Sequence, residues 1–396
     1  MVKFPSHPRF NPQILIAVAA LHRDNFMMAL RVLIVPDKFK GTLTAHAAAT
    51  AIARGWRKAR RTDQLEPLPM SDGGDGFGEV MGALLDAKIQ KIQTVDAAHR
   101  RCAARWWWEP TSKTAIIESA GVIGLAQLPP GKFHPFQLDT FGLGAVVRAA
   151  SAQGARRCLI GIGGSATNDA GFGLARALGW EFHDRAGNSL ESWTQLHALT
   201  HLIPPARRRW FEETIVAVDV QNPLLGSEGC TRIYGPQKGL KPGDLAAAEK
   251  NLRRLAEVSK NQSQRDFAAQ PGAGAAGGLG FGFRCFLGAV LQPGFELFAR
   301  HAELGQRIRA ADLVITGEGA LDASSLMGKG VGEIARVCRK LEVPCLGLAG
   351  TVLSPKRTRK HFTSVHGLTD LTSAGQAKAK PALWLEKLAE KVAKAW

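Results

Sequence analysis

The strongest constraint on the fold is an alternation of apolar strands and amphipathic helices that occurs at both ends of the chain. Near the start, a strand expected at 31–35 precedes a helix at 45–60, which Thr44 is suited to cap. The last third returns to the same order, with strands expected at 312–316 and 343–349 and helices after them. Because alternation of this kind produces parallel sheets covered by helices, both chain ends are predicted to build one α/β domain.

The middle of the chain is richer in short strands and interrupts this alternation. We therefore expect an α/β fold in which a Rossmann-like, doubly wound parallel-sheet domain formed by both chain ends carries a second, inserted α/β domain. The expected division is 1–29 for an N-terminal extension that is disordered or dispensable, 30–75 with 286–396 for the Rossmann-like domain, and 76–285 for the inserted domain. A signal peptide is the alternative reading of the extension.

Composition narrows the class of protein. The chain has 396 residues, of which 45% are hydrophobic, and no apolar run approaches the roughly 20 residues of a membrane helix. Its six scattered cysteines form no C-x-x-C pair and are typical of buried thiols in a reducing, cytoplasmic protein. The net charge of +17 comes without a nucleic-acid-binding motif. We expect no membrane or nucleic-acid partner, and a homodimer is left open.

Four glycine-rich turns follow apolar strands, and they are the most informative motifs. Glycine lets backbone N–H groups approach a phosphate closely, and the N-terminus of a following helix adds partial positive charge. Such turns therefore favour a phosphate-binding site. The four turns read PMSDGGDG, GIGGSATNDAG, PGAGAAGG and ITGEGALD, and the third is expected to belong to a glycine-rich loop over 271–282.

The second turn also matches a dinucleotide-binding fingerprint through Gly161, Gly163 and Ala166. However, three of the four turns carry acidic residues, and a bare carboxylate beside a pyrophosphate is repulsive. A magnesium ion between the two would make the acid useful. Asp169 in this turn is thus either a metal ligand or a helix-start residue that the helix dipole favours.

Several charged residues follow expected strands, where ligands of open α/β sheets bind. Lys38 and Lys40 come just after the first strand, Asp72 lies in the SDGGDG turn, and Asp219 ends an apolar strand. No Walker A loop and no protein-kinase motif set is present. Phosphoryl transfer here would need its usual parts on another scaffold, which are phosphate donors, Mg²⁺ held by acids, and a group that orients or deprotonates the attacking hydroxyl.

In order and spacing, the motifs resemble the glycerate kinases of the bacterial two-domain type. The stretches that carry the resemblance are VPDKFKGTLTA, PMSDGGDG, IGIGGSATNDAG, DVQNPLLG, YGPQKG, PGAGAAGGLG and TGEGALD with the following GKG. The resemblance implies phosphorylation of D-glycerate with ATP and Mg²⁺, chiefly to 2-phosphoglycerate. It also implies a Rossmann-like domain built from both chain ends with a second α/β domain inserted.

On this reading, Lys40 holds the substrate carboxylate or the moving phosphoryl group, and Asp72 or Asp219 orients or deprotonates the hydroxyl. Asp169 and Glu318 would place Mg²⁺. The residues expected to contact ATP are Gly163, Gly164, Ser165, Thr167, Asn168, Gly274, Gly277 and Gly278.

The chain departs from the family pattern at some positions. Asp75 stands where the family usually has Glu, and Ala320 stands where a basic residue is frequent, so Ala320 is given no ligand role. Two alternative functions remain open from the sequence. They are an NAD(P)-dependent oxidoreductase, which rests on the dinucleotide fingerprint, and a non-enzymatic nucleic-acid-binding protein, which rests on the basic charge.

Overall fold

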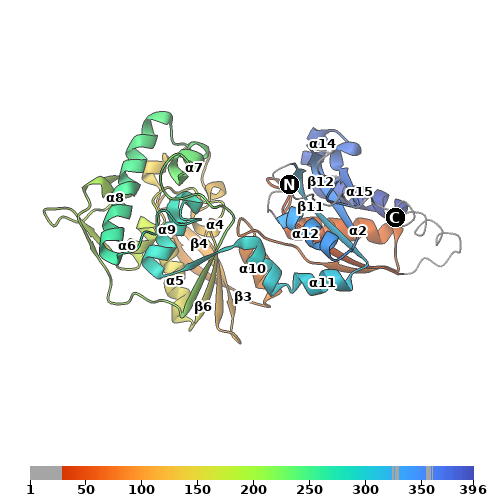
Figure 1. Ribbon diagram of the computed structural model, residues 1–396, viewed down its shortest axis with the longest axis horizontal. Helices are drawn as coiled ribbons and strands as arrows, with labels where there is room; N and C mark the ends of the chain where they lie inside the picture. The colour runs from red at the N-terminus through yellow and green to blue at the C-terminus, as the bar shows by residue number, and fades with distance from the viewer. Residues whose placement is uncertain (1–28, 323–324, 326–329, 354–357, 359) are drawn as a thin grey trace, which may run out of the picture.

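The computed structural model describes residues 29–322, 325, 330–353, 358 and 360–396. The expectations for residues 1–28, and for most of the GKG motif at 328–330, lie outside the described residues. In the described ranges, no helix is both long enough and apolar enough to cross a membrane. Figure 1 shows two α/β lobes, with α10 (Gly294–His301) between them.

The first lobe contains a five-stranded parallel sheet built from both chain ends, as the alternation predicts. Its strand order is β13-β12-β11-β1-β2. The strands are β1 (Arg31–Pro36), β2 (Gln64–Pro67), β11 (Leu313–Leu321), β12 (Cys345–Val352) and β13 (Ser364–Gly367).

Helices cover both faces of this sheet, which explains why its central strands are apolar throughout. Successive side chains of a strand point to opposite faces, so Val32 and Ile34 pack on one face while Leu33 and Val35 pack on the other. All four are buried. The helices of this lobe are α2 (Ala45–Ala59), α11 (Leu304–Ala310), α12 (Gly330–Lys340), α14 (Ala374–Ala379) and α15 (Pro381–Ala395).

The second lobe contains a six-stranded mixed sheet with the order β10-β9-β6-β5-β4-β3. The first three strands along the chain pair antiparallel, and the others pair parallel. The strands are β3 (Lys88–Val95), β4 (Arg101–Glu109), β5 (Thr114–Glu118), β6 (Arg157–Gly161), β9 (Glu213–Val218) and β10 (Val290–Pro293). The expected division of the chain, with 76–285 as the inserted part, stays a proposal.

One face of the second sheet packs against a large helical core, and the other continues into the core of the first lobe. Phe77 from α3 and Phe298 from α10 belong to this shared core, together with Leu33 and Ile334 of the first lobe. The remaining elements are α3 (Phe77–Leu84), α4 (Ala120–Ile123), α5 (Leu143–Ala152), α6 (Phe172–Ala177), β7 (Glu181–His183), β8 (His201–Ile203), α7 (Cys230–Lys238), α8 (Leu245–Ser263) and α9 (Ala275–Leu287).

The glycine-rich loop expected over 271–282 is wrong in its last part, because regular helix follows from Leu279 within α9 (Ala275–Leu287). The helix opens with three residues of positive φ, Ala276, Gly277 and Gly278, and becomes regular only after them. A Cβ atom on Gly280 would come within 2.2 Å of the Gly272 carbonyl oxygen. Close packing therefore requires glycine here and outweighs its poor helix propensity.

The strand expected at 312–316 does not break at GEGALD either. β11 continues to Leu321 and stays paired with β12 as far as Val352. Glu318 is consequently a strand residue, held in register beside Ala349 of the neighbouring strand.

Candidate functional site

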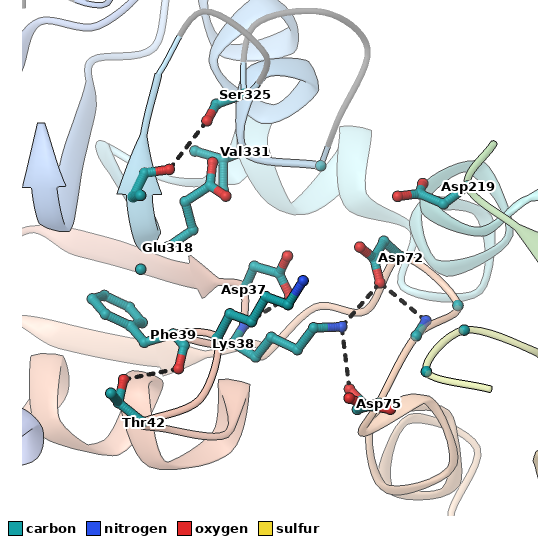
Figure 2. Close-up of a pocket in the computed structure, with 18 of the residues that line it drawn as sticks. Asp37, Lys38, Phe39, Thr42, Asp72, Asp75, Asp219, Glu318, Ser325 and Val331 are labelled. Carbon is teal, nitrogen blue, oxygen red and sulfur yellow. Dashed lines mark hydrogen bonds and ion pairs between the residues drawn. The ribbon is translucent and has the colours of Figure 1, made fainter. Parts of the chain in front are cut away.

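A cavity of about 1060 Å³ is lined by residues from both lobes. Its wall on the first lobe comes from the carboxyl ends of β1, β11 and β12, and its wall on the second lobe follows β6 and β9. Figure 2 shows side chains from both walls converging on it. Seven of the residues predicted from the sequence line the cavity, namely Lys40, Asp72, Gly163, Gly164, Ser165, Asp219 and Glu318.

The order in which the chain adds strands to the first sheet reverses at the cavity. The chain passes from β1 to β2 on one side and from β11 to β12 on the other, so the topological switch point lies between β1 and β11. Ligands of open α/β sheets bind at such points, outside the carboxyl ends of the strands. Asp37, directly after β1, and Glu318 of β11 both line the cavity there, and the Asp37 N–H donates to the Gly317 carbonyl at 2.8 Å.

Asp72 and Lys38 form an ion pair in the middle of the cavity (Figure 2). The Lys38 Nζ lies 3.4 Å from Asp72 Oδ1, and the same oxygen accepts a hydrogen bond from the Gly74 N–H at 3.0 Å. Asp219, directly after β9, lines the same cavity, and its side chain lies close enough to Asp72 to affect the pKa of that carboxyl group. The two predicted candidates for the base are therefore neighbours, drawn from different lobes.

The surroundings of this cluster shift the pKa values of two carboxyl groups in opposite directions. Burial would raise the pKa of Asp72, but the Lys38 ammonium and the Gly74 N–H outweigh burial and hold it below its usual range. Burial and the neighbouring Asp72 charge raise the pKa of Asp37, and Lys38 offsets them only in part. Asp72 is thus the carboxyl group better suited to be ionised at neutral pH, as a proton acceptor must be.

The GIGGSATNDAG turn presents only its first part to the cavity. Gly163, Gly164 and Ser165 line it, and a Cβ atom on Gly163 would lie 2.5 Å from the Gly74 Cα. The two glycine-rich turns therefore cross so closely that only glycine fits at position 163. Thr167 and Asn168 are fully buried and lie outside the cavity lining.

The predicted glycines of the third turn also lie outside the cavity lining. A Cβ atom on Gly277 would come within 1.9 Å of the Thr167 carbonyl oxygen, and one on Gly274 within 2.2 Å of the Pro223 carbonyl oxygen. Close packing between backbones is enough to explain both glycines. Contact of Gly274, Gly277 and Gly278 with ATP stays a prediction.

Asp169 is fully buried, and both of its oxygens accept hydrogen bonds from the protein. Oδ2 accepts from the Thr140 N–H at 2.9 Å, from the Thr140 hydroxyl at 2.7 Å and from the Gly173 N–H at 3.0 Å, while Oδ1 accepts from the Gly171 N–H at 3.3 Å. It does not line the cavity. The geometry favours the helix-start alternative over the metal-ligand role.

Among the charged residues that line the cavity, sequence reasoning gave no role to Asp37, Lys238, Asp322 and Lys378. Asp37 follows an apolar strand, as Asp219 does, so the same signal could have found it. Lys238 is the last residue of α7 and stands just before the final glycine of the YGPQKG motif, and nothing in this local sequence indicates that it lies at the cavity. Lys40 is exposed and lines the same wall as Asp37.

Metal ligands are sparse at the site. In the part of the chain that the structure describes, no group of three or more His, Cys, Asp or Glu side chains is placed to hold a metal ion. Mg²⁺ in phosphoryl transfer is commonly bound by one or two carboxylates together with substrate phosphates.

The fold and the site together define the class of protein. A doubly wound sheet with carboxylates at its switch point, glycine-rich turns opposite them and a lysine–aspartate pair between them provides the parts that phosphoryl transfer needs. The chain is an α/β phosphotransferase.

The chain belongs to the glycerate kinase family, whose sequence model matches residues 32–396. It is 36% identical over 326 residues to a glycerate 2-kinase of Escherichia coli K12, covering 82% of this chain and 86% of that one. It is 34% identical over 327 residues to a glycerate kinase of Bacillus subtilis 168, covering 82% and 85%. Family membership implies use of ATP and glycerate, and disfavours the oxidoreductase and nucleic-acid-binding alternatives.

A solved structure is also similar. The crystal structure of a presumed glycerate kinase 2 from Salmonella typhimurium LT2 matches with a TM-score of 0.78 and 31% sequence identity, covering 93% of this chain and 98% of that one. The likeness extends over both lobes and confirms the predicted α/β fold.

Proposed function

We propose that the protein transfers the γ-phosphoryl group of ATP to the 2-hydroxyl of D-glycerate, giving 2-phosphoglycerate and ADP. The observation that carries the proposal is the ion-paired Asp72 in a cavity lined by both lobes, facing a glycine-rich turn. The choice of the 2-hydroxyl is supported by the similarity to a relative named glycerate 2-kinase.

The cavity residues have distinct roles in this reaction. The Asp72 carboxylate accepts the proton of the attacking hydroxyl, whose oxygen forms a bond to the γ-phosphorus while the bond from phosphorus to the ADP oxygen breaks. Asp219 lies beside Asp72 and orients the same hydroxyl. Lys38 holds Asp72 in its ionised form. Lys40 binds the glycerate carboxylate or the moving phosphoryl group, and Gly163, Gly164 and Ser165 bind phosphate oxygens.

The residues at the switch point fit a magnesium ion. Pro36 of β1 pairs with Gly317 of β11, so Asp37 and Glu318 are the next residues of two paired strands, and their negative charges add to that of Asp72 in a half-buried place. We propose that this pair holds Mg²⁺, with Glu318 as predicted and Asp37 in place of Asp169. When bound, the ion would neutralise charge on the ATP phosphates.

The proposed reaction is tested by incubating the protein with D-glycerate, ATP and Mg²⁺ and resolving the products by ³¹P NMR. We expect ADP release that depends on D-glycerate, with 2-phosphoglycerate as the product. Absence of D-glycerate-dependent ADP release would refute the proposed function. Formation of 3-phosphoglycerate would keep the kinase but overturn the choice of hydroxyl.

We expect Asp37→Asn and Glu318→Gln each to raise the Mg²⁺ concentration needed for half-maximal rate by about tenfold or more. Each change removes one charged oxygen ligand while keeping the shape of the side chain. The measurement is the initial rate at fixed ATP as Mg²⁺ is varied.

Asp312→Asn is the matched control for these two changes, because Asp312 lies at the opposite end of β11 and its ion pair with Arg31 is solvent-exposed. Its Mg²⁺ dependence should equal that of the unchanged protein. Equal Mg²⁺ dependence in all four proteins would show that the ion binds elsewhere.

A further inference from the structure

Lys238 is a charged side chain held almost wholly out of water in the wall of the cavity. It is the last residue of α7, it is 8% exposed, and it lines the cavity. Lysine is seldom buried to this extent without a paired charge. The burial of the Lys238 side chain therefore needs a physical explanation.

The protein supplies Lys238 with little compensation for its charge. Its Nζ donates to the Thr167 carbonyl oxygen at 2.6 Å, and among the described residues no carboxylate oxygen lies within 4.0 Å of that nitrogen. An ammonium has three donors and no acceptor. Burial lowers its pKa to about 8, and the nearby Cys230 and Asp169 only partly oppose that shift.

These two neighbours do not act as counterions in contact with the ammonium. Both oxygens of Asp169 accept hydrogen bonds from Thr140, Gly171 and Gly173. Burial raises the pKa of the Cys230 thiol to about 11, so it is neutral at physiological pH. A buried cation with one neutral acceptor is costly unless a further anion meets it.

The surroundings of Lys238 place it where a substrate can supply that anion. A Cβ atom on Gly277 would lie 2.9 Å from the Lys238 Nζ, so the ammonium sits between the SATND turn and the start of α9. Ser165 and Ala276, which line the cavity, are joined by a hydrogen bond of 3.3 Å from the Ser165 hydroxyl to the Ala276 carbonyl. Lys238 thus belongs to the same wall as the predicted phosphate-binding turn.

We propose that the Lys238 ammonium binds an oxyanion of a substrate, either the carboxylate of glycerate or a phosphate of ATP, in the second-lobe wall of the cavity. This inference rests on the proposed function and adds a binding residue to it. The ligand oxygen completes the hydrogen bonds of the ammonium and supplies the missing negative charge.

The test is steady-state kinetics of Lys238→Gln, with Lys238→Arg and Lys241→Gln beside it. Glutamine can still donate to the Thr167 carbonyl but carries no charge. Lys241 is exposed, lies outside the cavity lining and gives a control with the same loss of charge. We expect Lys238→Gln to raise one KM by about tenfold or more, Lys238→Arg to raise it less, and Lys241→Gln to leave it unchanged.

The substrate whose KM rises identifies the anion. An increase confined to glycerate indicates its carboxylate, and an increase confined to ATP indicates a phosphate. If Lys238→Gln leaves both KM values within about twofold of the unchanged protein, the proposal is overturned.

Thermal unfolding separates binding from a merely structural role. Without ligands, Lys238→Gln should unfold at the same temperature as the unchanged protein or a higher one, because it removes a poorly compensated buried charge. The rise in that temperature with added MgATP or D-glycerate should shrink for the substrate concerned. A lower unfolding temperature with undiminished ligand shifts would mean that Lys238 only holds the Thr167 carbonyl.

The unfolding measurement also keeps the inference separate from the proposed reaction. If the unchanged protein releases no ADP in response to D-glycerate, the proposed function fails, while ligand-dependent shifts still report whether Lys238 binds an anion. If Lys238→Gln does not fold, Lys238→Met, which also removes the charge, takes its place, and undiminished shifts in that variant with both ligands count against the proposal.

Discussion

Replacing Asp72 with asparagine is expected to lower kcat by about 10³-fold, within the range that a general base contributes. The Lys38 ammonium and the Gly74 N–H hold the pKa of Asp72 below its usual range despite burial, so the group is a carboxylate at neutral pH. Asparagine has nearly the same shape but cannot accept the proton of the hydroxyl. The measurement is kcat from a coupled assay of ADP release at saturating substrates.

Two neighbouring carboxylates serve as comparisons for this change. Asp219→Asn should reduce kcat by a smaller factor, because Asp219 is more exposed and is proposed only to orient the hydroxyl. Asp75→Asn should have little effect, since Lys38 contacts only its backbone carbonyl. Near-normal kcat for Asp72→Asn together with a large loss for Asp219→Asn would assign the base to Asp219.

The architecture was predictable because local sequence patterns indicate its strands and helices. Apolar runs such as 32–35 mark buried parallel strands, and helical spacing marks the elements that cover them. The prediction failed at 271–282, where glycine normally opposes a helix. There the close approach of Gly280 to the Gly272 backbone, which precedes the helix, decides the conformation, and helix propensity does not take such a packing contact into account.

The site was predictable only in part, for a related reason. Residues that follow strands, such as Asp72 and Asp219, could be placed at the ligand-binding edge of a sheet from the sequence. Within the GIGGSATNDAG turn, however, the sequence does not show which side chains face the cavity. Ser165 lines the cavity, whereas Asp169, four residues later, is turned inward to Thr140. Asp37 and Lys238 come together with the others only through the pairing of β1 with β11 and the packing of α7.

The second large effect is expected from Asp169→Ala, which should lower the free energy of unfolding by about 3–5 kcal/mol. The change removes the carboxylate oxygen that accepts from the Thr140 and Gly173 N–H groups, in a place that water does not reach. Unpaired donors of this kind carry the full cost of their lost solvation. Asp169→Asn keeps one acceptor oxygen and should cost less. Urea denaturation of the ligand-free protein measures both changes.

The same two variants decide between the two roles left open for Asp169. A residue that only fixes the start of α6 affects stability, so Asp169→Asn, assayed where it is folded, should keep the Mg²⁺ dependence of the unchanged protein. A metal ligand would behave in the opposite way, with a tenfold rise in the Mg²⁺ requirement and little change in stability. Because the carboxylate already accepts four hydrogen bonds and lies outside the cavity lining, we expect the first outcome. In that case Asp169 would shape the turn that is predicted to bind phosphate, and the proposed metal ligands, Asp37 and Glu318, would lie on the opposite lobe.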